Sequence, residues 1–311
     1  MNNLEISVIS PVYGAASLLP ELVARIDKTL SKITSEYEII LVEDNSPDNS
    51  WEIINQIVET NDRVVGLSLS RNFGQQNALT AGFDYATGDY IITLDCDLQD
   101  EPENIEYLYH KALEGYEIVF ASRVDRQDGF IKKTASFLFY KVLGYLTETQ
   151  QDNSIANYIL YSRKAVDAMA KMGDYYRYYP MLNKWVGFKS VKLSISHAKR
   201  KDNMLSSYTY RKRLRLAFST IVAFSDKPLR LILGLGFIFV LLSLSVALIL
   251  VVRYITMGHE VSGWLSVFLS IWFLSGITTI TLGLIGIYIG KIFETVKNRP
   301  TYLIKGITRK S

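Results

Sequence analysis

Two long segments near the carboxyl end of the chain carry no charged residue, and they limit the folds open to it more than any other feature. Leu231–Val252 is uncharged over 22 residues and Trp264–Gly290 over 27. As helices they would be about 33 Å and about 40 Å long, whereas the hydrocarbon core of a bilayer is about 30 Å thick. Two buried core helices are the alternative, but core helices of this length normally carry a polar face. The sequence therefore predicts two membrane-spanning helices.

The charges that flank these segments indicate their orientation. The short loop between them, Arg253–Gly263, carries one Arg, whereas the opposite ends are rich in Lys and Arg. Because positively charged flanks stay in the cytoplasm, we expect an integral membrane protein whose N-terminal part and C-terminal tail are both cytoplasmic. The predicted parts are a soluble domain (1–200), a basic juxtamembrane segment (201–228), two spans (229–292) and a basic tail (293–311). The flanking residues are Lys227, Arg230, Lys291, Lys297, Arg299, Lys305, Arg309 and Lys310.

Glycines give the second predicted span a face of small residues. Gly286 and Gly290 are four apart, and Gly276 and Gly283 lie on nearby turns. Such a face allows close packing of helices and favours association of several copies of the chain. The ordinary glycine content of membrane helices is an equally good explanation.

Residues 1 to about 200 alternate strand and helix signals. This pattern favours a Rossmann-like α/β fold with a mostly parallel sheet that is covered on both faces. No Gly-x-Gly-x-x-Gly follows the first strand and no Walker-type loop is present, so the sequence does not support dinucleotide binding. The predicted strands are Ile6–Val12, Tyr37–Val42, Val64–Leu69, Tyr90–Leu94, Ile118–Ala121, Tyr158–Tyr161 and Val191–Ser196. The predicted helices are Leu18–Leu30, Ser50–Val58, Gln76–Tyr85, Ile105–Leu113 and Lys164–Met169.

Two of the predicted strands end in acidic residues. Asp95, Asp97 and Gln99 follow one strand, and Glu43 and Asp44 end another. The carboxyl ends of strands are where open α/β sheets bind their ligands. Carboxylate and amide oxygens suit Mg²⁺ or Mn²⁺, which would keep open positions for substrate phosphates. A solvated turn that caps a helix starting near Pro102 is the alternative.

Basic and aromatic segments precede the predicted spans. Phe130–Leu146 and Tyr208–Phe224 are apolar with interspersed Lys and Arg, as expected for helices that lie in a membrane interface. Packing on the sheet, with the basic side chains reaching out to water, is the alternative. The position beside a membrane span favours lipid headgroups or a lipid phosphate over nucleic acid as the partner of these charges. The single cysteine, Cys96, excludes an internal disulfide framework.

With these motifs in place, the chain resembles family 2 glycosyltransferases, specifically the polyprenyl-phosphate glycosyltransferases such as dolichol-phosphate mannose synthase and bacterial bactoprenol glucosyltransferases. The resemblance covers essentially the whole chain, including two terminal spans typical of the bacterial branch. It implies a GT-A fold and a bacterial inner-membrane location. The segments that carry it are Pro11–Tyr13, Val42–Ser46, Ser70–Gly74, Asp95–Asp100, Ser122–Arg123, Tyr161–Val166 and Lys297–Pro300.

The resemblance also implies roles for individual residues. The donor would be a UDP- or GDP-linked sugar, the acceptor an undecaprenyl-type polyprenyl phosphate and the cofactor Mg²⁺ or Mn²⁺. The family further suggests a homo-oligomer such as a tetramer. The implied nucleotide-sugar site is Pro11, Val12, Tyr13, Glu43, Asp44, Asn45, Asp95 and Asp97, and the implied metal ligands are Asp95, Asp97 and Gln99. The implied acceptor-phosphate site is Arg123, Lys132, Lys133, Ser136, Arg200, Ser207 and Tyr208.

Three positions depart from the family pattern. Gly14-Ala15-Ala16 stands where relatives often have Asn-Glu-Glu, and Glu43-Asp44-Asn45-Ser46 stands where they have Asp-Asp-Gly-Ser. Asn157 occupies the position of an Asp that is a proposed acceptor base. A phosphate monoester has a second pKa of about 6, so it needs positioning rather than deprotonation at neutral pH. Asn157 is therefore interpreted as an orienting group, with a purely structural role as the alternative.

These expectations combine into one hypothesis, an inverting transfer of a sugar to a polyprenyl phosphate, with Asp97 and Asn157 as the catalytic candidates. A processive polysaccharide synthase is one rival, but the chain has no Gln-x-x-Arg-Trp segment and few spans. A catalytically inactive, membrane-tethered nucleotide-binding scaffold is the other rival. The changes at Asn157 and at Gly14–Ala16 leave this rival open, and the intact Asp95, Asp97 and Gln99 argue against it.

Overall fold

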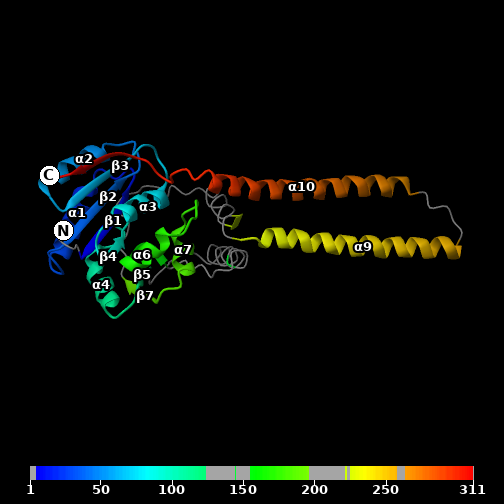
Figure 1. Ribbon diagram of the computed structural model, residues 1–311, viewed down its shortest axis with the longest axis horizontal. Coiled ribbons are helices and arrows are strands. Elements are labelled where there is room, and N and C mark those ends of the chain that lie inside the picture. The colour runs from blue at the N-terminus through cyan, green and yellow to red at the C-terminus, as the bar shows by residue number, and fades with distance from the viewer. Residues whose placement is uncertain are drawn as a thin grey trace. The chain divides into compact units, whose positions relative to one another are not determined.

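The computed structural model describes residues 5–123, 144, 155–195, 221–222, 225–257 and 263–310. These residues fall into two compact units, one with an α/β fold and one that contains two long helices (Figure 1). The α/β unit includes both the N-terminal part and the segment Arg299–Ser311. The chain therefore leaves the α/β unit, forms the two long helices and returns to the unit from which it started.

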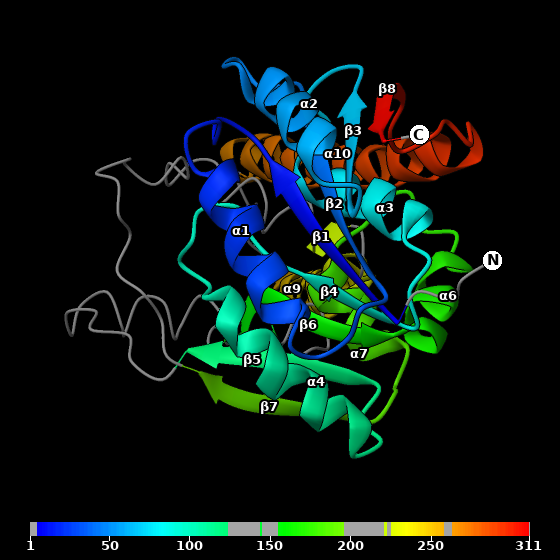
Figure 2. The same cartoon turned by 90° about the vertical axis from the view of Figure 1, so that its left-hand side faces the viewer.

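The α/β unit is built on one sheet of eight strands, β1 (Ile6–Val12), β2 (Tyr37–Glu43), β3 (Val64–Leu69), β4 (Tyr90–Thr93), β5 (Ile118–Arg123), β6 (Ile155–Ser162), β7 (Ser190–Ile195) and β8 (Ile304–Arg309). The strand order is β7-β5-β6-β4-β1-β2-β3-β8 (Figure 2). The pairs β1–β2, β1–β4, β2–β3 and β5–β7 are parallel, whereas β4–β6, β5–β6 and β3–β8 are antiparallel. The sheet is mostly parallel, as predicted, and is mixed only because β6 and β8 run against the other strands.

Helices cover both faces of the sheet, as the sequence predicted (Figure 2). The helices of this unit are α1 (Leu19–Leu30), α2 (Ser50–Thr60), α3 (Gln75–Tyr85), α4 (Ile105–Leu113), α6 (Arg163–Ala170) and α7 (Tyr179–Trp185), with a 3₁₀ turn η1 (Pro102–Asn104). The helices α1, α2 and α4 share one apolar core with the strands, while α3 packs on β1 and β2 from the other side. The strands β1, β2 and β3 are buried along their whole length, which explains their continuous apolar sequences.

The strand β8 was not predicted, because the sequence indicated only a basic tail. It pairs antiparallel with β3, with Ile307 opposite Leu67 and Thr308 opposite Gly66. Gly66 is required here, since a Cβ atom at this position would lie 2.6 Å from the Thr308 methyl group and 2.4 Å from an Ile54 methyl group. The C-terminal segment is therefore an integral edge of the sheet.

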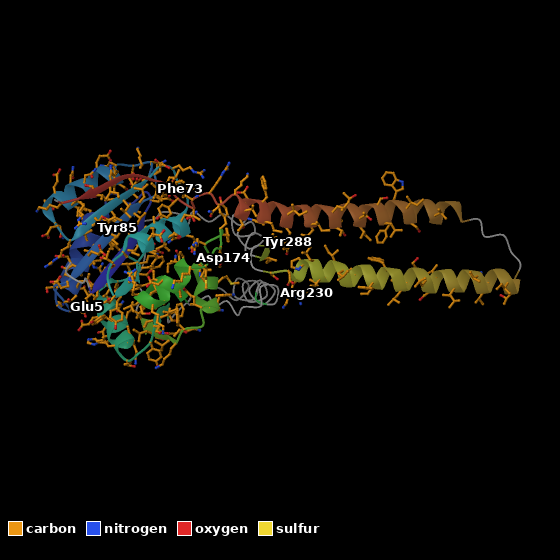
Figure 3. All side chains as sticks on the ribbon, in the orientation of Figure 1. Glu5, Phe73, Tyr85, Asp174, Arg230 and Tyr288 are labelled. Carbon is orange, nitrogen blue, oxygen red and sulfur yellow. The ribbon has the colours of Figure 1, made fainter. Side chains whose placement is uncertain are left out.

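The second unit consists mainly of α9 (Lys227–Met257) and α10 (Trp264–Val296), which contain the two predicted spans and are long and apolar enough to cross a membrane. The Phe239 and Phe273 rings meet edge to face at 5.6 Å. Side chains project outward along both helices, and many large apolar ones are more than half exposed (Figure 3). In the described part of the chain, a Cβ atom added at any glycine of the small-residue face would meet no neighbouring atom within 4 Å; these are Gly276, Gly283, Gly286 and Gly290.

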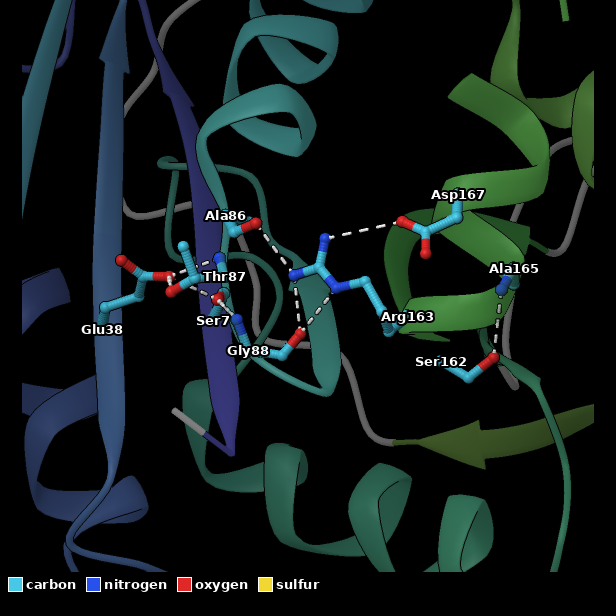
Figure 4. Close-up of polar contacts among 9 residues, drawn as sticks. All are labelled: Ser7, Glu38, Ala86, Thr87, Gly88, Ser162, Arg163, Ala165 and Asp167. Atoms are coloured by element: carbon cyan, nitrogen blue, oxygen red, sulfur yellow. Dashed lines mark hydrogen bonds and ion pairs between the residues drawn. The ribbon is translucent and has the colours of Figure 1, made fainter. Parts of the chain in front are cut away.

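A buried polar network holds the amino ends of the central strands (Figure 4). The Glu38 carboxylate accepts hydrogen bonds from the Ser7 hydroxyl at 2.7 Å and from the backbone N–H and hydroxyl of Thr87 at 2.8 and 2.9 Å. The Arg163 guanidinium donates to the carbonyls of Ala86 and Gly88 at 2.9 and 2.6 Å. Arg163, which belongs to one of the family motifs, therefore fixes the turn between α3 and β4 at the edge opposite the acidic strand ends.

Replacing Glu38 with Ala should lower the free energy of unfolding by about 2–4 kcal/mol, because the buried Ser7 hydroxyl and two donors of Thr87 lose their acceptor. Pulse proteolysis of the full chain in detergent across a urea series measures this quantity. Glu59→Ala, which removes an exposed carboxylate from α2, is the control. Equal stability of the two variants would show that the network contributes nothing.

Candidate active site

Adjacent parallel strands bring the two acidic motifs to one edge of the sheet. β1 lies between β2 and β4, and backbone hydrogen bonds continue past the strand ends, from Asp44 N–H to the Val12 carbonyl and from Leu94 N–H to the Ile9 carbonyl, both at 3.0 Å. Because these three strands are parallel, Asp44 and Asp95 both follow carboxyl ends at this edge. The structure thus confirms that the motifs share an edge of the sheet.

Asp44 is buried and is held by the backbone of the loop that follows β3. Its two carboxylate oxygens accept hydrogen bonds from the N–H groups of Phe73 and Gly74 at 2.7 and 2.8 Å. Burial raises the pKa of Asp44 above its ordinary value, and the two N–H donors offset part of that shift. The Ser70–Gly74 loop is therefore anchored on Asp44.

Glu43 is also buried, and it connects three segments. One carboxylate oxygen accepts from the Ser68 hydroxyl of β3 at 2.8 Å, and the other accepts from the backbone N–H of Ser46. The shorter side chain of an aspartate would reach the Ser68 hydroxyl and the Ser46 N–H less easily. The glutamate at this position therefore connects β2 to β3 and to the loop after β2. Asn45 is exposed and has a positive φ of 50°, a conformation that Asn tolerates better than most residues.

Asp95 is held by two neutral amides. The Gln75 side chain, at the start of α3, donates to one carboxylate oxygen at 2.7 Å, and the Asn157 side chain of β6 donates to the other at 3.4 Å. Sequence reasoning missed Gln75, although its place directly after a loop motif and before an amphipathic helix is a usable signal. Asn157 therefore lies beside the predicted metal motif, and its orienting role stays a prediction.

The segment after Asp95 forms a tight turn. The Asp97 carboxylate accepts from the backbone N–H of Gln99 at 3.1 Å, and Leu98 between them has a positive φ of 57°. Such a conformation costs a buried leucine about 1–3 kcal/mol and often marks a functional site. The capping alternative is not supported, because the residue before the η1 turn, Glu101, makes no side-chain cap and neither does Asn104 before α4.

The donor set fits a hard divalent cation that shares its coordination with substrate. Asp95 and Asp97 provide carboxylate oxygens, and no group of three or more His, Cys, Asp and Glu gathers among the residues that the structure describes. Mg²⁺ and Mn²⁺ are commonly bound by one or two carboxylates together with substrate phosphates. Cys96 is a poor thiolate ligand, because burial and the nearby Asp95 and Asp97 raise its pKa to about 12.

The other predicted nucleotide-site residues differ in accessibility. Pro11 and Val12 are buried, so they can offer a ligand backbone groups more readily than side chains. Tyr13 is 55% exposed and follows β1 directly. The Gly14 N–H donates to the Ser46 hydroxyl at 3.2 Å, so the loops after β1 and β2 are joined.

Most of the predicted acceptor residues cannot be placed. Arg123 ends β5, but its side chain lies outside the described part of the structure. The interfacial segments Phe130–Leu146 and Tyr208–Phe224 fall outside the described residues as well, apart from residues 144, 221 and 222. The remaining acceptor predictions lie outside the described residues: Lys132, Lys133, Ser136, Arg200, Ser207 and Tyr208.

Comparisons with known proteins agree with this geometry. A sequence model of glycosyl transferase family 2 matches residues 7–169. An uncharacterized glycosyltransferase from Synechocystis sp. is 37% identical over 305 residues, covering 98% of this chain and 96% of that protein.

Two solved structures are similar in fold. Glucosyl-3-phosphoglycerate synthase from Mycobacterium tuberculosis, in complex with Mn²⁺, uridine diphosphate and phosphoglyceric acid, has a TM-score of 0.51 at 14% identity, covering 71% of this chain and 77% of that one. Mannosyl-3-phosphoglycerate synthase from Rubrobacter xylanophilus has a TM-score of 0.50 at 16% identity, covering 71% and 73%. At these identities the likeness shows a shared GT-A fold.

Replacing Gln75 with Ala should weaken Mn²⁺ binding by about 10- to 100-fold, because Asp95 loses the amide that orients it. Electron paramagnetic resonance of free Mn²⁺, titrated with the full-length protein, measures the affinity directly. The neighbouring amide provides a matched control, since Gln76 accepts a hydrogen bond from the Tyr179 N–H at 3.1 Å. Gln76→Ala should keep wild-type affinity, and an equal loss in both variants would contradict the role given to Gln75.

Proposed function

The chain belongs to glycosyl transferase family 2, and from that premise we propose that it transfers a sugar from a UDP- or GDP-linked donor to the phosphate of a membrane polyprenyl phosphate, with inversion at the anomeric carbon. The observation that carries the proposal is the acidic edge of β4, β1 and β2, where Asp95 is held by Gln75 and Asn157. A chain with this edge and two helices long enough to cross a membrane is suited to a lipid acceptor.

The chemistry requires one bond to form and one to break. A phosphate oxygen of the acceptor attacks the anomeric carbon while the bond from that carbon to the donor's β-phosphate oxygen breaks. The nucleoside diphosphate leaves with the electron pair. No proton has to be removed, because the acceptor phosphate is already an anion at neutral pH. A neutral Asn157 beside Asp95 is compatible with this reaction, since no general base is needed there.

The leaving diphosphate makes the heaviest demand. Asp95, Asp97 and Gln99 would hold the divalent cation, which offsets the charge that develops on the diphosphate. The loop on Asp44 and the exposed Tyr13 would border the nucleoside. The turn that contains Leu98 would keep Asp97 beside Asp95, so that the carboxylates do not have to reorganise as charge develops.

Further features support the acceptor side of the proposal. The basic residues carried over from the family, Arg123, Lys132, Lys133 and Arg200, would neutralise the acceptor phosphate, with Ser136, Ser207 and Tyr208 as hydrogen-bonding partners. Within the described part of the chain the glycine face of α10 has no close neighbour, which suits it to contact with a second copy in a homo-oligomer such as a tetramer. The location proposed is the inner membrane of a bacterium.

A donor screen tests the proposal. The full-length protein in detergent is incubated with undecaprenyl phosphate, Mg²⁺ or Mn²⁺ and a panel of UDP- and GDP-sugars, and lipid products are detected by mass spectrometry. We expect one sugar per lipid phosphate with one donor, and Asp97→Ala should lower the rate by about 100-fold or more. Asp62→Ala, at an exposed carboxylate on the loop before β3, should leave it unchanged.

The same screen separates the rivals. A polymer that grows on the product would favour a processive synthase. Nucleotide binding without any lipid product would favour the inactive scaffold. Full transfer by Asp97→Ala would contradict the metal assignment.

The proposed topology predicts opposite labelling of two introduced cysteines. Gly263→Cys lies before α10 and should react with a membrane-impermeant maleimide in intact cells, whereas Lys310→Cys should react only after permeabilisation. Cys96 contributes little background, because its raised pKa keeps it a thiol. Labelling of both positions from the same side would show that α10 does not cross the membrane and would contradict the proposed topology.

A further inference from the structure

The segment that follows the second long helix touches the site through two consecutive residues. The Leu303 carbonyl accepts a hydrogen bond from the backbone N–H of Ser70 at 2.9 Å. The Tyr302 hydroxyl donates to the Asp84 carboxylate at 2.8 Å. Ser70 begins the loop after β3, and Asp84 lies in the last turn of α3. Residues 302 and 303 therefore hold both ends of one continuous stretch, Ser70–Tyr85.

That stretch carries the groups that orient both acidic motifs. The N–H groups of Phe73 and Gly74 hold Asp44, and the Gln75 side chain holds Asp95. The hydrogen bonds depend on the position of this loop and of the first turn of α3, which has no side-chain cap of its own. A shift at either end of Ser70–Tyr85 would therefore alter the hydrogen bonds to Asp44 and to Asp95 together.

We propose that the C-terminal segment Tyr302–Arg309 is a positioning element of the donor site: it fixes the stretch that orients Asp44 and Asp95. The inference rests on the proposed function, because it assigns the segment to the nucleotide-sugar site of that reaction. It gives the chain after the second candidate span a role in donor binding. Neither the family motifs nor the charges of the basic tail assign that role.

Backbone pairing anchors the segment, although the side chains of β8 are mostly exposed. β8 pairs with β3 up to Ile304 opposite Leu69, the last residue of β3. Trp51 of α2 lies close to Gly66 of β3 and to Gly306 of β8. The Tyr302 ring is half-buried, and burial together with the Asp84 carboxylate raises its pKa, so the hydroxyl stays a donor at neutral pH.

The variant Tyr302→Phe tests the proposal in the full-length protein. It removes the hydroxyl and keeps the ring, so β8 should remain in place. We expect UDP or GDP, whichever the wild type binds, to bind about fivefold more weakly by isothermal titration calorimetry. The KM for the sugar donor should rise by a similar factor with kcat almost unchanged, because the reacting groups themselves are intact.

A matched control separates positioning from general stability. The Tyr37 hydroxyl donates to the Asp27 carboxylate at 2.6 Å, and Tyr37 begins β2 at the opposite edge of the sheet. Tyr37→Phe removes the same kind of hydrogen bond, together with one that the hydroxyl accepts from Arg63 at 2.6 Å, and should leave nucleotide affinity unchanged. Asp84→Asn keeps an acceptor for Tyr302 and should bind nucleotide like the wild type, whereas Asp84→Ala should behave like Tyr302→Phe. Asp84 is exposed, so these variants preserve the test if Tyr302→Phe does not fold.

The outcomes are distinct for the two proposals. Wild-type nucleotide affinity in both Tyr302→Phe and Asp84→Ala would overturn the positioning role, and so would an equal loss in Tyr37→Phe. A wild-type protein that binds nucleotide but makes no lipid product would refute the proposed acceptor and leave the positioning result intact. A wild-type protein that binds neither UDP nor GDP would refute the donor site and the positioning role with it.

Discussion

The structure depends on how two carboxylates at strand ends are held by neutral donors. Asp44 accepts from two backbone N–H groups and Asp95 from two side-chain amides. Hydrogen bonds to a charged group contribute about 1.5–3 kcal/mol each, so these contacts stabilise the loops without placing a positive charge beside either carboxylate. A cation bridged to phosphates can then add to an edge that is already ordered. The same donors explain why the β3–α3 stretch is as much a part of the site as the acidic motifs.

Much of the fold follows from local pattern. The predicted strand Ile6–Val12 and the predicted helix Ile105–Leu113 have the same bounds in the structure. The first is a short, largely apolar run and the second has a helical period, and both have polar or turn-forming flanks. Strand direction has no such local signal, since an apolar run such as β6 reads the same either way. The antiparallel pairing of β6 with β4 therefore could not be predicted from the sequence, and neither could the mixed character of the sheet.

The site shows a similar division. Carboxylates at strand ends are visible in a sequence, so Glu43, Asp44, Asp95 and Asp97 could be named in advance. Their partners are harder to see, because Phe73 and Gly74 act through backbone N–H groups that any residue but proline has. Gln75 and Asn157 act through neutral amides, and only the pairing of β6 beside β4 brings Asn157 to Asp95. An aspartate at 157 would instead place a second negative charge next to Asp95, so the asparagine changes the electrostatics of the edge as well as its proton chemistry.

The position of β8 links the order of the chain to its topology. During synthesis the sheet gains its last strand only after α9 and α10, because Ile304–Arg309 follows these helices in the chain and pairs with β3. If α9 and α10 each cross a membrane, this pairing requires an even number of crossings, since β3 and β8 must meet on the same side. The charge asymmetry around the candidate spans independently predicts that both flanks lie on the same side of the membrane, because Lys and Arg are costly to move across a bilayer. A strand that closes the sheet, holds the β3–α3 stretch and follows the second candidate span thus joins that span to the α/β unit by covalent continuity.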